Sequence, residues 1–254
     1  MIYDKTTVIQ KLDSFKLEIK KLYQSKNSGK KNHVMRYLET YYNRFGKMIE
    51  LIVEAFDSGK KKKVLDIGIA YGFYGIILKE EYGFDVMGME LKQFIPKYCA
   101  LCSKHKIQVK AGDLIKKTFP FSKGQFDVIV LGEIIEHIPL SPYLMFKRLK
   151  PYLKKNGIIV VTVPNIAHKR NIKRLLLGLN INERFSRDIE PTTKVDTRTH
   201  VREYDRFELE RDLEDADFLT EKIEMVDSEA DAASIFTKIF PRFKKYIMIR
   251  ARKK

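Results

Sequence analysis

The chain has 254 residues, of which 44% are hydrophobic and 32% are charged, and its formal net charge is +16. This composition is ordinary for a soluble globular protein, and the length fits one α/β domain with additions. No apolar run approaches the roughly 18 to 20 residues needed to cross a bilayer. The charged N-terminus also lacks the apolar region of a signal peptide, so we expect a cytoplasmic location.

The excess of lysine and arginine predicts attraction to an anionic partner. Nucleic acid, a phospholipid surface and a phosphorylated or carboxylated molecule all fit this charge. The alternative is a lysine-rich surface that only solvates the protein, because acidic residues are interspersed along the chain.

Residues 1–60 are predicted to be helical, because apolar side chains recur there at helical spacing. They include Val8, Leu12, Phe15, Ile19, Met35, Leu38, Phe45, Met48 and Ile52. We treat this segment as an N-terminal helical extension. It either covers a site on the domain that follows, residues 61–254, or makes a contact in an oligomer whose size the sequence leaves open.

The stretch KVLDIGIAYGFYGIILKEEYGFDVMGMEL, residues 63–91, is the segment around which the rest of the chain is organised. It predicts a strand at 64–67, a helix at 73–78 and a second strand at 84–89. Small residues form the turn between the first strand and the helix: Gly68, Ala70, Gly72 and Gly75. A strand, a small-residue turn, a helix, a strand and then the acid Glu90 form the nucleotide-binding half of a doubly wound sheet.

The residue before this turn indicates which ligand it binds. A dinucleotide site reads G-x-G-x-x-G and places a pyrophosphate at the helix N-terminus, whereas this turn reads D-x-G-x-A-x-G from Asp66. A carboxylate facing the turn suits a cationic ligand, and Glu90 can accept two hydrogen bonds from a ribose. This order resembles the first motif of class I S-adenosylmethionine (SAM) methyltransferases, usually D-x-G-x-G-x-G, from which Ala70 departs. The resemblance implies that SAM is the cofactor and that Asp66→Ala abolishes its binding.

Later segments extend this resemblance. A short strand at 106–110 precedes Asp113 and Leu114, which the family would place against the adenine amine and ring; the alternative is a helix N-cap aspartate. The segments FDVIVLGEIIEHI and LKKNGIIVVTVPN, on predicted strands 126–132 and 157–163, resemble ubiquinone-biosynthesis-type O-methyltransferases. The implied fold is a Rossmann-like, seven-stranded, mostly parallel sheet with an antiparallel last strand. The implied cofactor-binding residues are Asp66, Gly68, Ala70, Gly72, Glu90, Leu91, Asp113, Leu114 and Glu133.

Three titratable residues follow the fourth strand as E-x-x-E-H: Glu133, Glu136 and His137. On a helical turn these spacings would place them on one side. His137 could act as a general base, because its pKa lies near neutrality. Alternatively the cluster holds Mg²⁺ or Mn²⁺, or it is purely structural. The motif also resembles small-RNA 2′-O-methyltransferases, in which a distant histidine completes a magnesium site, and that resemblance implies His200. Our candidate catalytic residues are His137, Glu136 and His200.

Residues 165–200 form a basic insertion after the fifth strand, where it would overhang the ligand-binding edge of the sheet. It contains His168, Lys169, Arg170, Lys173, Arg174, Arg184 and Arg187, and we expect it to recognise the substrate. The sequence from His200 to Leu209 then resembles the family pattern H-x-R-x-[FY]-x-x-x-E-L.

The C-terminal part predicts strands at 219–226 and 246–251, separated by a segment with apolar and basic residues. Its apolar members are Ile235, Phe236, Ile239 and Phe240. An apolar face flanked by bases can lie on an anionic membrane, but we favour the alternative that it packs on the sheet.

The leading hypothesis is a SAM-dependent methyltransferase that acts on an oxygen of a small or lipid-linked anionic molecule, such as a glycan, quinone or isoprenoid intermediate. Peripheral contact with a membrane would fit such an acceptor. A rival is an RNA 2′-O-methyltransferase, although no recognisable RNA-binding module is present, which makes nucleic acid the less favoured partner. A third hypothesis is a SAM-binding protein without catalysis.

Overall fold

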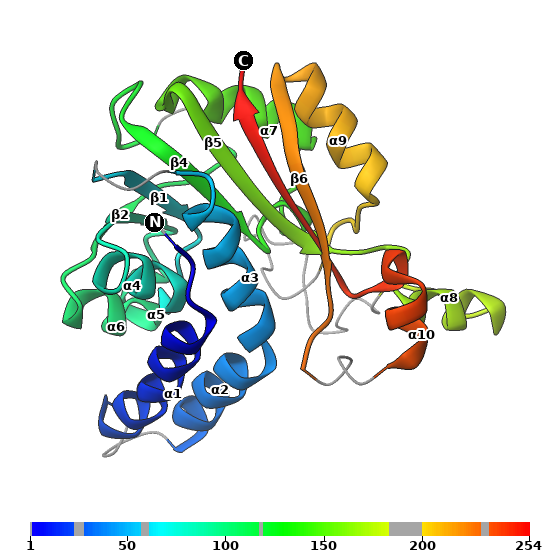
Figure 1. Ribbon diagram of the computed structural model, residues 1–254, viewed down its shortest axis with the longest axis horizontal. Helices are drawn as coiled ribbons and strands as arrows, with labels where there is room; N and C mark the ends of the chain where they lie inside the picture. Colours follow the sequence, from blue (N-terminus) through cyan, green and yellow to red (C-terminus); the bar gives the residue numbers. More distant parts are fainter. Residues whose placement is uncertain (1, 23–27, 57–60, 117–118, 183–199, 230–233) are drawn as a thin grey trace.

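The computed structural model describes residues 2–22, 28–56, 61–116, 119–182, 200–229 and 234–254. The strands are β1 Lys63–Ile67, β2 Asp85–Glu90, β3 Gln108–Ala111, β4 Phe126–Gly132, β5 Leu153–Pro164, β6 Phe218–Val226 and β7 Tyr246–Lys253. They form one sheet in the order β3-β2-β1-β4-β5-β7-β6 (Figure 1). The β1, β2, β3, β4 and β5 pairings are parallel, whereas β7 runs antiparallel to β5 and β6. The predicted seven-stranded, mostly parallel sheet with an antiparallel last strand is confirmed.

Helices pack on both faces of this sheet. The helices of the described chain are α1 Lys5–Leu22, α2 Ser28–Thr40, α3 Tyr42–Val53, α4 Phe73–Glu80, α5 Ile95–Tyr98, α6 Ala100–Lys104, α7 Pro142–Leu149, α8 Lys169–Leu176, α9 Arg206–Asp215 and α10 Ile235–Ile239, of which α8 and α10 lie beyond the end of the sheet. Three 3₁₀ turns are η1 Ile135–His137, η2 Lys150–Tyr152 and η3 Pro241–Phe243. Because strand residues alternate between faces, Val64 packs in the core beneath α1, α3 and α4, and Leu65 packs in the core beneath α7 and α9.

The three N-terminal helices share a core with the sheet. Val8, Leu12, Phe15 and Ile19 of α1 are all buried, and the Phe15 ring lies 5.3 Å from that of Phe73 at the start of α4. This apolar stripe at helical spacing explains why α1 packs rather than projects. The same packing brings α2 and the start of α3 to the edge where the parallel strands end.

The segment 93–104 is divided into α5 and α6 at Cys99. One sequence expectation fails in detail. The apolar residues of 235–240 do not pack on the sheet as we favoured: Ile235 is 72% exposed and Ile239 is 64% exposed. Only Thr237 of α10 is buried, where its hydroxyl donates a 2.6 Å hydrogen bond to Asp227. In the described part of the chain, no helix combines the length and apolar character that a membrane span requires.

Candidate functional site

The turn after β1 requires small residues. Gly68, Ala70 and Gly72 all have left-handed backbone conformations, with φ of 70°, 45° and 71°. A Cβ atom on Gly68 would lie 2.1 Å from Cδ1 of Ile134, so a larger residue would have to displace the Ile134 side chain and also adopt a left-handed conformation. Ala70 adopts the same left-handed region at some steric cost, which explains why the family's commonest residue there is glycine.

Glu90, at the end of β2, lies beside this turn and accepts a hydrogen bond from its backbone. Its Oε2 accepts a hydrogen bond of 3.2 Å from the Ala70 N–H, and its Oε1 accepts one of 2.9 Å from the Leu91 N–H. Burial raises the pKa of Glu90, and the two N–H donors oppose that rise. The carboxylate is therefore held in a fixed orientation at the carboxyl edge of the sheet, as expected for a ribose acceptor.

Asp66 does not face the cavity above the turn. Its side chain is completely buried, and Tyr74 of α4 donates a short hydrogen bond to Oδ1. Burial raises its pKa to about 8, the Tyr74 hydrogen bond opposes the rise, and the charge of Glu90 adds to it. Asp66 therefore acts on any ligand through the position of β1 and α4, and not by the direct contact with a cationic ligand that we inferred from the sequence.

A cavity of about 550 Å³ lies above the turn, and we call it the glycine-turn cavity. The predicted cofactor residues that line it are Gly68, Ala70, Glu90, Leu91, Asp113, Leu114 and Glu133. Asp113 Oδ1 accepts a 2.9 Å hydrogen bond from the Ile115 N–H. Residues 114–116 are not helical, so the alternative of a helix N-cap at Asp113 is wrong. Asp66 and Gly72 do not line this cavity.

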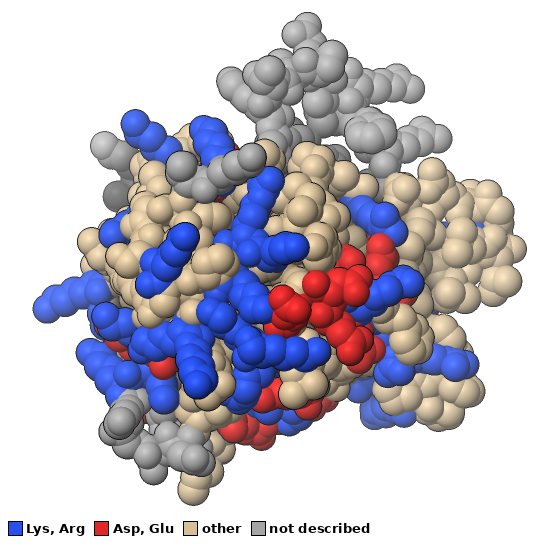
Figure 2. All heavy atoms as spheres, turned by 90° about the horizontal axis from the view of Figure 1, so that it is seen from above, with Lys and Arg blue, Asp and Glu red and all other residues tan. Residues whose placement is uncertain are grey.

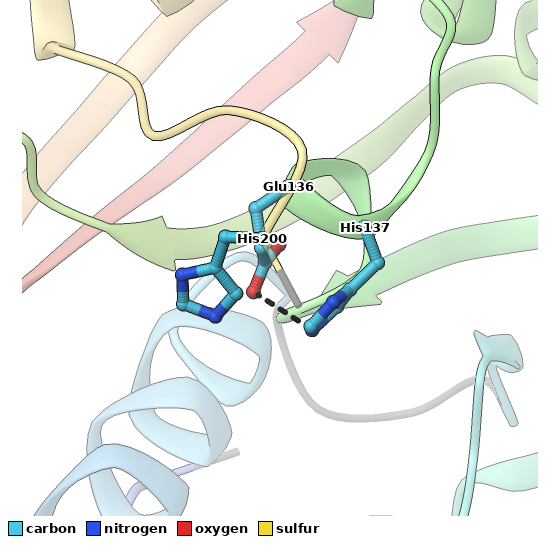
Figure 3. Close-up of side chains that lie close together, drawn as sticks. All are labelled: Glu136, His137 and His200. Carbon is cyan, nitrogen blue, oxygen red and sulfur yellow. Dashed lines mark ion pairs between the residues drawn. The ribbon is translucent and has the colours of Figure 1, made fainter. Parts of the chain in front are cut away.

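Glu136, His137 and His200 come together at one wall of this cavity, and we call them the Glu–His cluster (Figure 3). One ligand atom from each residue lies within 4.8 Å of the others. Glu136 Oε1 is 3.8 Å from His137 Nε2, and the two imidazole rings are 4.9 Å apart. The Glu136 backbone carbonyl also accepts the Val201 N–H at 2.7 Å, which joins the segment at His200 to η1.

The Glu136 carboxylate is the most unusual group of the cluster. It is completely buried, and neither oxygen accepts a hydrogen bond in the described part of the chain. Burial raises its pKa well above the ordinary glutamate value, and the charge of Glu133 adds to that rise. Buried carboxylates without partners are costly. A divalent cation or a protonated imidazole would remove that cost, so the oxygen and nitrogen donors present here fit Mg²⁺ or Mn²⁺.

Glu133 is not part of the Glu–His cluster, although the sequence suggested it as a ligand. Its φ of 58° turns the chain between β4 and η1, so the E-x-x-E-H motif does not form the helical turn we assumed. Its carboxylate pairs with Arg44 at 2.9 Å and accepts a 3.1 Å hydrogen bond from Thr162. Both oxygens therefore already have partners outside the Glu–His cluster.

The N-terminal helices supply residues that sequence reasoning missed. Arg44 of α3 is 4% exposed, and its guanidinium lies 4.1 Å from the centre of the Tyr41 ring. His33, Tyr37, Tyr41 and Arg44 all line the glycine-turn cavity, so the N-terminal helices form part of its wall. The sequence did contain one indication that Arg44 points inward. Arg44 precedes Met48 by four residues, so both lie on the same, core-facing side of the helix.

A second cavity of about 670 Å³ adjoins the first, and we call it the basic cavity. Its charged and ionisable lining residues are Glu133, His168, Arg170, Arg174, His200, Glu203 and Lys245. Tyr41, Glu133 and His200 line both cavities. The expected substrate-recognition insertion thus contributes α8 to this wall, whereas Arg184 and Arg187 fall outside the described residues.

Comparisons with known proteins agree with this architecture. A family model described as a methyltransferase domain matches residues 41–223. Phosphoethanolamine N-methyltransferase 3 of Arabidopsis thaliana is 30% identical over 113 residues, which are 43% of this chain and 22% of the plant protein. The chain therefore spans about a fifth of the length of that curated relative.

Solved structures show the same fold at low identity. A SAM-dependent methyltransferase of Thermotoga maritima superposes with a TM-score of 0.58 at 15% identity, covering 88% of this chain and 96% of the other. A geranyl diphosphate C-methyltransferase of Streptomyces coelicolor, determined with Mg²⁺, geranyl diphosphate and S-adenosyl-L-homocysteine, gives 0.54 at 15% identity. The shares covered are 83% of this chain and 81% of that enzyme.

Proposed function

The chain belongs to the methyltransferase domain family of SAM-dependent enzymes, and from that premise we propose that it methylates an oxygen of an anionic, small or lipid-linked molecule. SAM is the cofactor, and it occupies the glycine-turn cavity. The acceptor occupies the basic cavity. The observation that carries this proposal is that the two cavities meet at the Glu–His cluster, with His200 in both linings.

The charge of the basic cavity supports an anionic acceptor. Arg170 and Arg174 come from α8, and Lys245 comes from the residue before β7. His168 adds an imidazole to the same lining. The lining also contains two acidic residues. Glu133 is already paired with Arg44, and Glu203 accepts a 2.7 Å hydrogen bond from Asn171. The basic groups therefore outnumber the acids and favour a phosphate or carboxylate.

Methyl transfer from a sulfonium is an in-line displacement at carbon, so the protein must align the acceptor and remove its proton. Glu90 would bind the ribose, and Asp113 with Leu114 would bind the adenine. The hydroxyl of the acceptor would extend from the basic cavity past His200 to His137, which lines the glycine-turn cavity. The His137 imidazole would take the proton while Glu136 stabilises the resulting charge. Tyr41, just before α3, and Arg44 of α3 line this space.

The Glu–His cluster can also hold Mg²⁺ or Mn²⁺ through Glu136, His137 and His200. When bound there, such a cation would lower the pKa of the acceptor hydroxyl. The two arrangements are separable by experiment. If Glu136→Ala retains full activity with a saturating chelator present, the cluster holds no catalytic metal.

The proposed acceptor atom rests on the resemblance of the motifs to O-methyltransferases and on the Glu–His cluster, because an alcohol needs a base or a metal more than an amine does. The second candidate is N-methylation of a phosphorylated amino alcohol, which the name of the Arabidopsis relative favours. The Streptomyces enzyme binds an isoprenoid diphosphate with Mg²⁺, which supports a lipid-linked anion as one kind of acceptor.

The RNA 2′-O-methyltransferase remains a separate candidate because of the E-x-x-E-H sequence. RNA binding would weaken steeply with salt, since each phosphate contact releases counterions. Salt-independent or absent binding of short RNA would remove this candidate. A protein that binds SAM without catalysis would show SAM affinity but no methyl transfer to any acceptor class.

The proposal is tested with tritium-labelled SAM and three acceptors: polyprenyl-phosphate-linked sugars, phosphoethanolamine and short RNA. Label on the sugar-linked lipid supports it, and label on phosphoethanolamine alone overturns it. Arg170→Gln should raise the acceptor KM roughly tenfold, because it removes a charged contact, and leave SAM affinity unchanged. Lys173→Gln is the matched control, because Lys173 is also exposed on α8 but does not line the basic cavity. Equal effects of the two substitutions would refute the placement of the acceptor.

A further inference from the structure

One end of the molecule carries a concentration of exposed apolar side chains, which we call the apolar tip. Its members are Leu175, Leu176, Leu177, Leu179, Ile235, Phe236, Ile239 and Phe240. These are eight of the seventeen large apolar side chains that are exposed in the described part of the chain. Leu176 is 83% exposed, more than any large apolar residue except Ile2. Such a concentration is unusual, because single exposed apolar residues are normally scattered.

The two segments of the apolar tip, 175–179 and 235–240, lie at the same end of the molecule. Figure 1 places α8 and α10 together there. Nearby, the Asn165 side chain joins the parts of the chain next to these segments: it donates hydrogen bonds of 2.9 and 2.8 Å to the carbonyls of Arg242 and Lys244, which follow α10, and accepts the Ala167 N–H just before α8. The two segments of the apolar tip therefore lie at one end of the molecule although they are far apart in the sequence.

The aromatic side chains of the apolar tip already contact one another in the unbound protein. The Phe236 ring lies 5.3 Å from the Phe240 ring and 5.4 Å from the Phe243 ring. Aromatic pairs at such distances stabilise each other. The side chains of α10 thus remain grouped at the surface although they bury little against the sheet.

Basic residues alternate with the apolar residues of the tip or lie next to them in the sequence, and acidic residues are absent from its segments. The bases are Lys169, Arg170, Lys173, Arg174, Lys238, Arg242, Lys244 and Lys245, and neither 169–179 nor 235–245 contains Asp or Glu. Figure 2, which looks from above, shows tan surface with blue side chains next to it at the same right-hand end. An apolar surface bordered by bases is the pattern of an interfacial membrane contact.

We propose that the apolar tip docks on an anionic lipid bilayer. A second copy of this chain is a poorer occupant, because it would bring the same bases against each other. A nucleic acid would pair with the bases but would leave exposed leucine and isoleucine side chains without a partner. An anionic bilayer suits both kinds of side chain, because the apolar residues can insert among the acyl chains while the basic residues pair with the anionic headgroups.

Docking would also bring the opening of the basic cavity close to a lipid-linked acceptor in the bilayer. Arg170 and Arg174 lie on α8 and line the basic cavity, and Lys245, which follows η3, lines it from the other side. The opening toward the acceptor is therefore built by the same two segments that meet the bilayer. This part of the inference rests on the proposed function, whereas the docking itself does not.

The test is sedimentation with vesicles of phosphatidylcholine containing about a quarter phosphatidylglycerol. The full chain should sediment with them, and only weakly with pure phosphatidylcholine. The triple variant Leu176→Ser/Ile235→Ser/Ile239→Ser should bind at least about tenfold more weakly. The matched control is Leu17→Ser/Leu219→Ser, which removes exposed apolar residues of α1 and β6 and should bind as the unsubstituted chain does.

Two results would overturn the docking: the triple variant sediments as the unsubstituted chain does, or the unsubstituted chain forms a dimer that the triple substitution dissociates. Circular dichroism and SAM affinity should be equal for all variants, which separates docking from folding. Methylation of a detergent-dispersed acceptor should also survive the triple substitution. If vesicle binding holds but Arg170→Gln leaves the acceptor KM unchanged, the proposed acceptor site fails and the docking stands.

Discussion

The buried Asp66 predicts how the stability of the cofactor-free protein depends on pH. Its carboxyl is completely buried, it has one hydrogen-bond donor in Tyr74, and its Oδ2 accepts no hydrogen bond in the described part of the chain. Burial raises its pKa from 3.8 to about 8. Between these two pH values the folded protein holds a proton that the unfolded chain has released. The free energy of unfolding must therefore fall as the pH rises through this window.

The size of the effect follows from the same two pKa values. A rise to about 8 corresponds to an upper limit of about 6 kcal/mol, because one pKa unit is worth about 1.4 kcal/mol. Relaxation around the ionised group reduces this, and we expect about 2–4 kcal/mol. Asp66→Asn should remove the dependence, because an amide resembles the protonated carboxyl and can still accept the Tyr74 hydrogen bond.

Urea unfolding of both proteins at about pH 5 and about pH 8 measures this directly. At the lower pH the two should differ by about 1–2 kcal/mol, because only the part of the window between 3.8 and 5 has been crossed, and at the higher pH Asp66→Asn should be the more stable by the full effect. Glu136 also has a raised pKa, but it contributes equally to both proteins and cancels in the comparison. The charge of Glu90 adds to the pKa rise of Asp66, so the coupling of these two carboxyls is part of the difference that the comparison measures. Asp85→Asn, on the partly exposed start of β2, is the control. Parallel pH profiles for Asp66→Asn and the unsubstituted chain would refute the reasoning.

Three further substitutions test the site by other measurements. Glu90→Ala should weaken SAM binding at least tenfold by calorimetry, because it removes a charged acceptor worth about 1.5–3 kcal/mol per hydrogen bond; unchanged affinity would remove Glu90 from the ribose site. Arg44→Ala should lower the free energy of unfolding by about 3 kcal/mol, since it leaves Glu133 partly buried and unpaired, and a loss below 1 kcal/mol would contradict that. Ala70→Gly should leave SAM affinity within about threefold, because it relieves a left-handed alanine at the cost of chain entropy; a large loss would show that the Ala70 methyl contacts the ligand.

Several parts of the fold could be predicted from local sequence. β1, the small-residue turn, α4 and Glu90 lie within about one β-α-β unit, and their patterns depend on neighbours in the chain. The same holds for β4, whose apolar run predicted its bounds to the residue. The candidate cofactor residues Glu90, Asp113 and Leu114 line one cavity as expected, because the ends of parallel strands meet at one edge.

Other features depended on contacts between distant segments. The E-x-x-E-H spacing suggested a shared helical face, but the left-handed backbone at Glu133 separates that carboxylate from Glu136 and pairs it with Arg44. No pattern in the neighbouring sequence predicts this ion pair, because Arg44 lies on α3 and Glu133 follows β4. The exposure of Ile235 and Ile239 likewise depends on what the sheet leaves uncovered, not on their own spacing.

The sequence by itself determined the family-type sheet and the position of the cofactor edge, because strand periodicity and the small-residue turn are properties of neighbouring residues. Only the tertiary structure decided which side chains face the cavity. Asp66 points beneath the turn, His200 joins Glu136 and His137, and Arg44 covers them from α3. These positions arise from packing between elements that lie far apart in the chain, and hydrophobic patterning specifies that elements pack but not which polar groups then meet.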